Sequence, residues 1–155
     1  EVHALDVRAA ALEDLTWRAS RAGLRVRADL VRPDGPLPVP AGWADAVLVD
    51  APCSGSGTLR RHPEVRWRLS EAWIGELAAA QARILARAAP LVRPGGALVY
   101  ATCSLLPAEN QTVVAAFTSE HQDFSPEAAL GDDGRLWPHR AGTDGFYAVR
   151  LRRAG

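Results

Sequence analysis

The chain is 155 residues long, which is enough for one domain that buries a hydrophobic core. Hydrophobic residues make up 48% of it, as in folded globular proteins, and its formal net charge is zero, so no overall field attracts nucleic acid. The sequence contains no apolar run of about 18 residues that would span a membrane. Its two cysteines are too few for the disulfide framework of a small secreted protein. Composition therefore predicts a globular protein of the cytoplasm, in which any affinity for nucleic acid depends on local clusters of charge.

Hydrophobic patterning in the first third of the chain predicts alternating strands and helices. Residues 9–22 have the spacing of a helix with one apolar face, and Gly23 is placed to end it. Residues 46–50 form a continuous apolar run closed by an acid, which is typical of a strand buried on both faces. The predicted order is a strand at 2–7, a helix at 9–22, a strand at 24–29, a proline-rich loop at 33–42 and a strand at 46–50.

The rest of the chain continues this alternation. Ser70 can cap a long helix that reaches Ala89, and Pro107 can occupy the first turn of a helix that reaches Ser119. Three strands are predicted: residues 97–102 after a Pro-Gly-Gly turn, a short strand at Phe124 and a last strand at 145–152. Strands and helices in this succession predict an α/β fold with a mostly parallel sheet.

Four side chains with useful chemistry are predicted at the carboxyl ends of strands: Asp6, Asp29, Asp50 and Cys103. In open α/β sheets, ligands bind outside this edge of the sheet. We therefore expect the four side chains to share one rim, where a ligand would lie.

The two cysteines both follow predicted strands. Cys53 lies in the loop that begins at Asp50, in which Gly55 and Gly57 would let the backbone approach a planar ligand closely, and Cys103 follows the strand at 97–102. A buried cysteine is often only a small hydrophobic residue. Two cysteines without paired spacing or a histidine cluster make a poor zinc site, so no metal is predicted. Their placement at strand ends favours a role in chemistry.

The segments around both cysteines resemble those of a known enzyme family. Residues 50–57 read Asp-Ala-Pro-Cys-Ser-Gly-Ser-Gly and are followed by an Arg-His-Pro segment and a tryptophan at 61–67. Residues 100–104 read Tyr-Ala-Thr-Cys-Ser, with Pro-x-Glu-Asn at 107–110, and residues 144–148 read Asp-Gly-Phe-Tyr-Ala. They resemble motifs IV and VI and the closing strand of the Sun (Fmu) family of RNA cytosine-5 methyltransferases, most closely the bacterial enzymes that modify 16S ribosomal RNA. The resemblance extends over nearly the whole chain.

The resemblance implies a Rossmann-like class I methyltransferase sheet with an antiparallel last strand, and S-adenosylmethionine as cofactor. Cys103, as thiolate, would attack C6 of a cytosine, while Asp50 would hold or protonate N3 of the base and contribute to the cofactor site. After C5 receives the methyl group, Cys53 would assist the release of Cys103. Asp6 would hydrogen-bond the ribose of the cofactor and Asp29 would lie near its adenine, although each acid alone could be a solvated strand end or a helix cap.

A basic cluster follows the first cysteine loop, and it contains Arg60, Arg61, His62 and Arg66. A run of charge is often only a solvated surface. Its position directly after Cys53 favours contact with RNA phosphates, so we expect these four residues to bind RNA. The target base would have to leave its helix to reach the nucleophile.

The family's glycine-rich first motif, which wraps the methionine part of the cofactor, does not occur in these 155 residues. We interpret residues 1–155 as part of a methyltransferase catalytic domain that lacks its amino-terminal part. The missing part includes the first strand, which would lie between the strands at 2–7 and 46–50. We expect weak or no activity from this chain alone, and exposed strand edges would favour self-association to an unknown oligomeric state.

Three other hypotheses stay open. A methyltransferase for another acceptor, such as an exocyclic amine, leaves Cys103 unexplained. A non-catalytic RNA-binding module needs no nucleophile at all. A nicotinamide-dependent oxidoreductase on a similar sheet requires a glycine motif that is equally absent.

Overall fold

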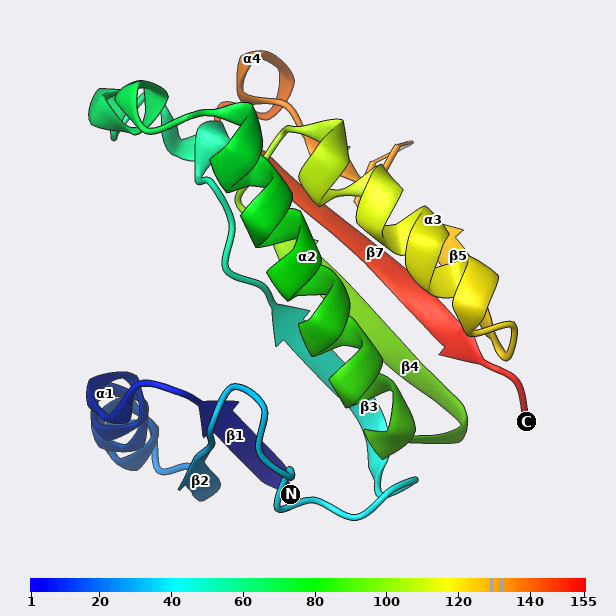
Figure 1. Cartoon of the computed structure of the whole chain (residues 1–155). Coiled ribbons are helices and arrows are strands. Elements are labelled where there is room, and N and C mark those ends of the chain that lie inside the picture. The colour runs from blue at the N-terminus through cyan, green and yellow to red at the C-terminus, as the bar shows by residue number, and fades with distance from the viewer. Residues whose placement is uncertain (129, 132) are drawn as a thin grey trace. The chain divides into compact units, whose positions relative to one another are not determined.

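The computed structural model describes residues 1–128, 130–131 and 133–155. The chain divides into two compact units, Glu1–Pro40 and Ala41–Gly155. Each unit has its own sheet, with β1 and β2 in the first and five strands in the second (Figure 1).

The first unit is a single strand–helix–strand motif. β1 (Val2–Asp6) and β2 (Val26–Leu30) pair in parallel, and α1 (Ala9–Arg21) connects them. Gly23 follows the helix with a φ of +68°, which is the left-handed conformation that ends helices and that glycine adopts without strain. The predicted strand, helix and strand are therefore confirmed, although β2 begins at Val26 rather than at Leu24.

The second unit is a five-stranded sheet with the order β3-β4-β7-β5, and β6 also pairs with β7. β3 and β4 run parallel, whereas β4, β5 and β6 all run antiparallel to β7, so the predicted antiparallel last strand is confirmed. In chain order the elements are β3 (Ala44–Asp50), η1 (Ser56–Thr58), η2 (Pro63–Trp67), α2 (Glu71–Ala88), η3 (Ala89–Leu91), β4 (Val92–Thr102), η4 (Pro107–Glu109), α3 (Gln111–Glu120), β5 (Phe124–Ala128), β6 (Arg135–Leu136), α4 (Pro138–Ala141) and β7 (Phe146–Arg153).

The hydrophobic core of the second unit lies between its two long helices and the sheet. α2 and α3 run along the same face of the sheet, over β4 and β7 (Figure 1). Leu85 of α2 and Phe117 of α3 are buried against Leu98, Tyr100 and Leu151 of those strands. The predicted cap of α2 is also present, because the Ser70 hydroxyl accepts a hydrogen bond from the Trp73 amide at 3.2 Å. This core fixes the strands whose carboxyl ends carry the two cysteine loops.

The prediction that residues 46–50 form a strand buried on both faces is wrong. Leu48 is 69% exposed, although Val49 beside it is buried. Among the strands that the structure describes, β3 pairs only with β4, so β3 is an edge strand. A continuous apolar run does not reveal how many neighbours a strand has.

Two predicted boundaries also differ from the structure. The strand predicted at 97–102 begins at Val92, because Val92 already pairs with Ala44 before the register shifts at Ala46. The helix predicted from Pro107 is interrupted at Asn110, whose φ of −119° and ψ of −96° are not helical. The Asn110 side chain instead bonds the strand end and the loop beyond it, accepting from the Thr102 hydroxyl and donating to a backbone carbonyl.

Candidate active site

The two cysteines come together although 50 residues separate them. Cys53 lies in the loop after β3, and Cys103 directly follows β4. The two strands are parallel neighbours in which Asp50 pairs with Ala101, so their carboxyl ends bring both loops to one place. The sulfur atoms lie 3.2 Å apart and both side chains are half-buried. The structure thus brings the two cysteines together, as the sequence predicted, and their role in catalysis stays a prediction.

The sulfurs share a hydrogen bond rather than a disulfide, since a disulfide would hold them at about 2.05 Å. A hydrogen bond from Cys53 lowers the pKa of the Cys103 thiol to about 7, even though burial and the negative charges of Asp50 and Glu109 oppose its ionisation. The same hydrogen bond and burial raise the pKa of Cys53 far above its ordinary range. The pair therefore titrates as one donor, Cys53, and one thiolate, Cys103.

Two glycines let the cysteine loops approach the start of β7. The Gly57 amide donates to the Cys103 carbonyl at 2.9 Å, and the Gly145 amide donates to the Gly57 carbonyl at 2.8 Å. A Cβ atom at Gly57 would overlap the Gly145 carbonyl oxygen and lie 2.9 Å from the Cys103 carbonyl oxygen. The glycine at position 57 is therefore required by close backbone contact within the protein, whereas the sequence suggested close approach to a ligand.

A buried carboxylate lies beneath the pair. Glu109 is fully buried, and its two oxygens accept hydrogen bonds from the Ser54 amide at 2.8 Å, the Ser54 hydroxyl at 2.5 Å, the Ser104 hydroxyl at 2.6 Å and the Gln81 amide group at 3.1 Å. Ser54 and Ser104 are the residues directly after the two cysteines. In the sequence, Glu109 is visible only as part of a Pro-x-Glu-Asn motif, without a predicted role. That motif was the available signal, but nothing in the sequence places the carboxylate between the two loops.

Asp50 ends β3 with an exposed side chain, close enough to Cys103 that its charge disfavours the thiolate. It is therefore an exposed acceptor near Cys103, at the strand end where the sequence predicted it. Its predicted contact with the base stays a prediction.

The basic cluster surrounds the loop that follows Cys53, and part of it is already paired. Arg60 and Arg61 both donate to Asp144, at 2.7 and 2.6 Å. The hydrogen bond to Asp144 raises the pKa of Arg61, and the negative charge of Cys103 also contributes, so this arginine lies near the cysteine pair. His62 lies 3.3 Å from Glu64.

Arg66 lies over the ring of Trp67, 4.5 Å from its centroid, and Trp67 is 79% exposed. An exposed indole beside a guanidinium group is a surface on which a nucleic-acid base can stack. The structure thus adds Trp67 to the predicted set, and it shows that two of the four predicted RNA-binding residues, Arg60 and Arg61, share one carboxylate, that of Asp144. Binding of RNA by these residues stays a prediction.

The two predicted cofactor residues of the first unit lie at one edge of its strand pair. Asp6 ends β1 and pairs with Leu30, next to Asp29 in β2. The side chain and the amide of Arg8 both donate to Asp6 and lower its pKa. A hydrogen bond from His3 lowers the pKa of Asp29, and Arg27 adds a second contact at 3.2 Å. Each carboxylate already has partners within the chain, so its role toward a cofactor stays a prediction.

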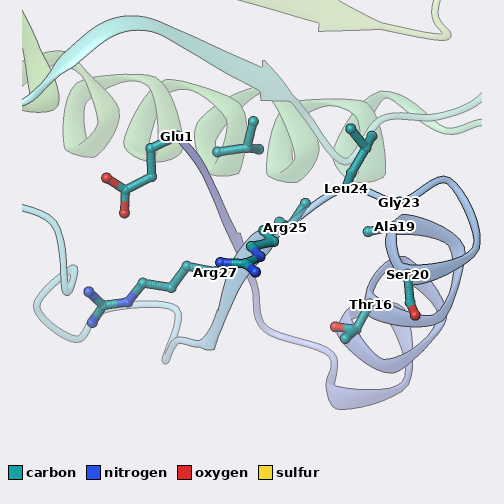
Figure 2. Close-up of a pocket in the computed structure, with 10 residues that line it drawn as sticks. Glu1, Thr16, Ala19, Ser20, Gly23, Leu24, Arg25 and Arg27 are labelled. Atoms are coloured by element: carbon teal, nitrogen blue, oxygen red, sulfur yellow. The ribbon is translucent and has the colours of Figure 1, made fainter.

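The first unit also contains a hollow of about 630 Å³, at the other end of its strands. Val2 and Val26, which begin β1 and β2, line it together with residues of α1 and the segment before β2. Figure 2 shows Thr16 and Ser20 of the helix on one side, and Arg25 and Arg27 on the other. Asp6 and Asp29 do not line this hollow, so it is distinct from the predicted cofactor residues.

Two absences hold for the residues that the structure describes. Among them, no group of three or more histidine, cysteine, aspartate or glutamate side chains is arranged to hold a metal ion. Likewise, none of the described helices is long and apolar enough to cross a membrane.

The chain is similar to known proteins over nearly all its length. The family described as 16S rRNA methyltransferase RsmB/F matches residues 1–152. Ribosomal RNA small subunit methyltransferase B of Erwinia tasmaniensis is 39% identical over 97% of this chain, which spans 36% of that relative. A probable ribosomal RNA small subunit methyltransferase B of Bacillus subtilis is 43% identical over 72% of the chain, which spans 28% of that relative. The chain thus corresponds to well under half the length of either protein.

Solved structures agree with these sequence similarities. The crystal structure of the protein PH0851 is 34% identical, with a TM-score of 0.91 over 99% of this chain and 37% of that one. A structure of NSun6 from Pyrococcus horikoshii with SFG is 26% identical, with a TM-score of 0.81 over all of this chain and 42% of that one. These similarities confirm the predicted α/β methyltransferase fold.

Proposed function

Because this chain belongs to the 16S rRNA methyltransferase RsmB/F family, as the resemblance of its cysteine motifs predicted, we propose that it provides the catalytic cysteines of an enzyme that methylates C5 of a cytosine in RNA. S-adenosylmethionine is the proposed methyl donor. The names of the relatives favour 16S ribosomal RNA as the substrate and, with it, a location in the cytoplasm. The observation that carries the proposal is the Cys53–Cys103 pair, in which one thiol donates a hydrogen bond to the other at 3.2 Å.

The first step uses the ionised form of Cys103. With a pKa of about 7, a large fraction of this thiol is a thiolate at neutral pH, so no separate base is needed to activate it. The thiolate adds to C6 of cytosine, which forms an Sγ–C6 bond and moves electron density toward C5 and N3. Asp50, exposed at the end of β3, would donate a proton to N3 and so stabilise the negative charge that the addition creates there.

The second step restores the base and the enzyme. When bound, S-adenosylmethionine supplies the methyl group that C5 receives. A base then removes the C5 proton, the electron pair re-forms the C5–C6 double bond, and the Sγ–C6 bond breaks as Cys103 leaves as a thiolate. Cys53 is placed to donate a hydrogen bond to that departing sulfur, which makes it a better leaving group. The geometry thus supports different roles for the two cysteines.

The first unit carries acceptors that fit the cofactor. Asp6 and Asp29 lie on the neighbouring parallel strands β1 and β2, near their carboxyl ends, with side chains 27% and 33% exposed, and carboxylates there are suited to accept hydrogen bonds from ribose hydroxyls or an adenine amine. Arg8 and His3 now occupy part of their hydrogen-bonding capacity. We propose that Asp6 contacts the ribose and Asp29 the adenine, each while keeping or exchanging its protein partner.

The loop that follows Cys53 is the proposed contact for RNA. Arg66 has an ion-pair partner in none of the described residues and stacks on the exposed Trp67, so the two offer a positive charge and a stacking surface together. Arg60 and Arg61 would exchange part of their contact with Asp144 for phosphate oxygens.

The test is trapping of a covalent protein–RNA adduct. The complete gene product that contains these residues is incubated with S-adenosylmethionine and a 16S RNA fragment carrying 5-fluorocytosine. Fluorine at C5 cannot leave as a proton does, so the enzyme stays attached after methyl transfer. The wild type and Cys53→Ala are expected to form an adduct that survives denaturing electrophoresis, and Cys103→Ala is expected to form none.

Other outcomes would support the competing hypotheses. Methylation that persists in Cys103→Ala without an adduct would overturn the proposal in favour of another acceptor, such as an exocyclic amine. RNA binding with neither methylation nor an adduct in the wild type would favour a non-catalytic RNA-binding module.

A further inference from the structure

A fully buried carboxylate links the two cysteine loops. Glu109 is 0% exposed, and no arginine or histidine forms an ion pair with it among the residues that the structure describes. A buried carboxylate without a counter-ion is stable only when several donors satisfy it. Glu109 meets this condition with four donors on its two oxygens, at 2.5–3.1 Å.

Three of the four donor groups belong to the residues next to the two cysteines, and the fourth is the Gln81 side chain of α2. Ser54, which follows Cys53, donates through both its amide and its hydroxyl, and Ser104, which follows Cys103, donates through its hydroxyl. The same Ser104 hydroxyl lies 3.0 Å from that of Ser56, which adds a second link between the loops. One carboxylate therefore holds both loops at the residue adjacent to each sulfur.

We propose that Glu109 is a positioning residue that holds the thiols of Cys53 and Cys103 in hydrogen-bonding contact. The inference rests on the proposed function only in that it takes Cys103 as the nucleophile. Glu109 acts through Ser54 and Ser104 and does not touch the reacting atoms. Without it, the two loops keep the Ser56–Ser104 hydroxyl contact, the bond from the Leu105 amide to the Ser56 hydroxyl and the Gly57–Cys103 backbone bond, and we expect the sulfurs to move apart.

Charge and positioning predict opposite effects, which makes the inference testable. The charged or titratable groups that face the cysteine pair are Asp50, Arg61, Tyr100 and Glu109. The negative charge of Glu109 raises the pKa of Cys103, whereas the hydrogen bond from Cys53 lowers it and is the larger effect. Loss of the Glu109 charge alone would lower the pKa of Cys103. Loss of its positioning would raise it.

The experiment measures the rate at which iodoacetamide alkylates Cys103 as a function of pH, by mass spectrometry of the tryptic peptide that contains it. In Glu109→Gln, which keeps the shape but removes the charge and two of the acceptor sites, we expect the midpoint of the rate to rise by on the order of one pH unit. A midpoint that falls or stays unchanged would overturn the inference.

Two more variants separate positioning from loss of the fold. Ser104→Ala keeps the charge of Glu109 and removes one link, so its midpoint should rise as well, and it decides the question if Glu109→Gln does not fold. Phe117→Leu disturbs the core on α3, where Phe117 packs against Phe124, far along the helix from Glu109. Its midpoint should equal that of the wild type, and an equal rise in this control would mean that Glu109 serves only the fold.

The alkylation assay needs neither RNA nor cofactor. If the alkylation midpoint rises in Glu109→Gln as expected but the wild type forms no RNA adduct, the proposed function is rejected and the positioning role is kept. An RNA adduct without a midpoint shift would do the reverse.

Discussion

The hydrogen bond between the two thiols allows a quantitative prediction of the pKa of Cys103 in the variant Cys53→Ala. This change removes the group with the largest effect on the pKa of Cys103. Burial and the negative charges of Asp50 and Glu109 stay in place, and all three oppose ionisation. Cys103 in the variant should therefore titrate at or above the value of an ordinary cysteine.

The size of the effect follows from the two pKa values. An ordinary cysteine has a pKa of about 8.5, and that of Cys103 is about 7. The difference of about 1.5 units corresponds to about 2 kcal/mol in favour of the thiolate. At pH 7 the thiolate fraction would fall from about one half to about 3%.

Rate at a single pH is a poor measure of this change. A thiolate of higher pKa is a stronger nucleophile, with a Brønsted coefficient of about 0.4–0.5, so the lower thiolate fraction is partly offset. Alkylation at pH 7 is expected to slow only about threefold, whereas the midpoint of the rate against pH should move by the full difference. The midpoint should move to higher pH in the variant. The wild-type Cys103 has a lowered pKa, so it reacts above about pH 7 and loses reactivity as the pH falls through that value.

The assay is iodoacetamide alkylation of Cys103 across pH, with Cys53→Ser as the matched control. Serine keeps a hydroxyl donor beside the thiolate, so its midpoint should lie between those of the wild type and Cys53→Ala. A Cys53→Ala midpoint that stays near the wild-type value would refute the reasoning, because the low pKa would then have another origin than the thiol pair.

Two further predictions concern the glycine contact and the basic loop. Gly57→Ala should destabilise the protein by about 1–3 kcal/mol in thermal unfolding, because its Cβ would overlap the Gly145 carbonyl. Gly75→Ala, in α2, should instead stabilise it by up to about 1 kcal/mol, because no atom outside the neighbouring helix backbone lies within 4 Å of the added carbon, and equal losses in both would contradict the steric argument. Arg66→Ala should weaken binding of a 16S RNA fragment in fluorescence anisotropy and lower the slope of log K against log salt by about 1, whereas Arg83→Ala on exposed α2 surface should change neither. An unchanged slope in Arg66→Ala would remove this arginine from the RNA contact.

The meeting of the cysteines could be predicted from the sequence because it depends on local pattern and one general rule. Two apolar runs end three residues before Cys53 and directly before Cys103, and parallel strands place their carboxyl ends at one edge of a sheet. The rule requires the two strands to be neighbours, and β3 and β4 are. The helix that starts after Ser70 was predictable for a similar reason, since its cap is local to the chain.

The exposure of Leu48 and the pairing of Arg60 and Arg61 were not predictable in this way. Whether a strand lies at an edge depends on which other strands pair with it, and an apolar run carries no record of its neighbours. Asp144 lies 84 and 83 residues from the two arginines that it binds, and no periodicity connects them. The predicted RNA-binding cluster therefore carries less net positive charge in the folded chain than its sequence indicates.

Glu109 was predictable in part, since its motif is local to the sequence but its contacts come from distant segments. Its sequence motif was visible, but a glutamate followed by an asparagine at a helix start has an ordinary explanation as a solvated first turn. Only the convergence of three segments, the two cysteine loops and the break before α3, turns it into a buried acceptor for the residues beside both sulfurs. The non-helical backbone at Asn110 belongs to the same arrangement, since Asn110 binds Thr102 and the Ser104 carbonyl while the backbone carbonyl of Glu109 accepts from the Tyr100 hydroxyl. In a regular helix that began at Pro107, Asn110 would have helical φ and ψ, so its bonds to Thr102 and to the Ser104 carbonyl depend on the interruption that the sequence failed to predict.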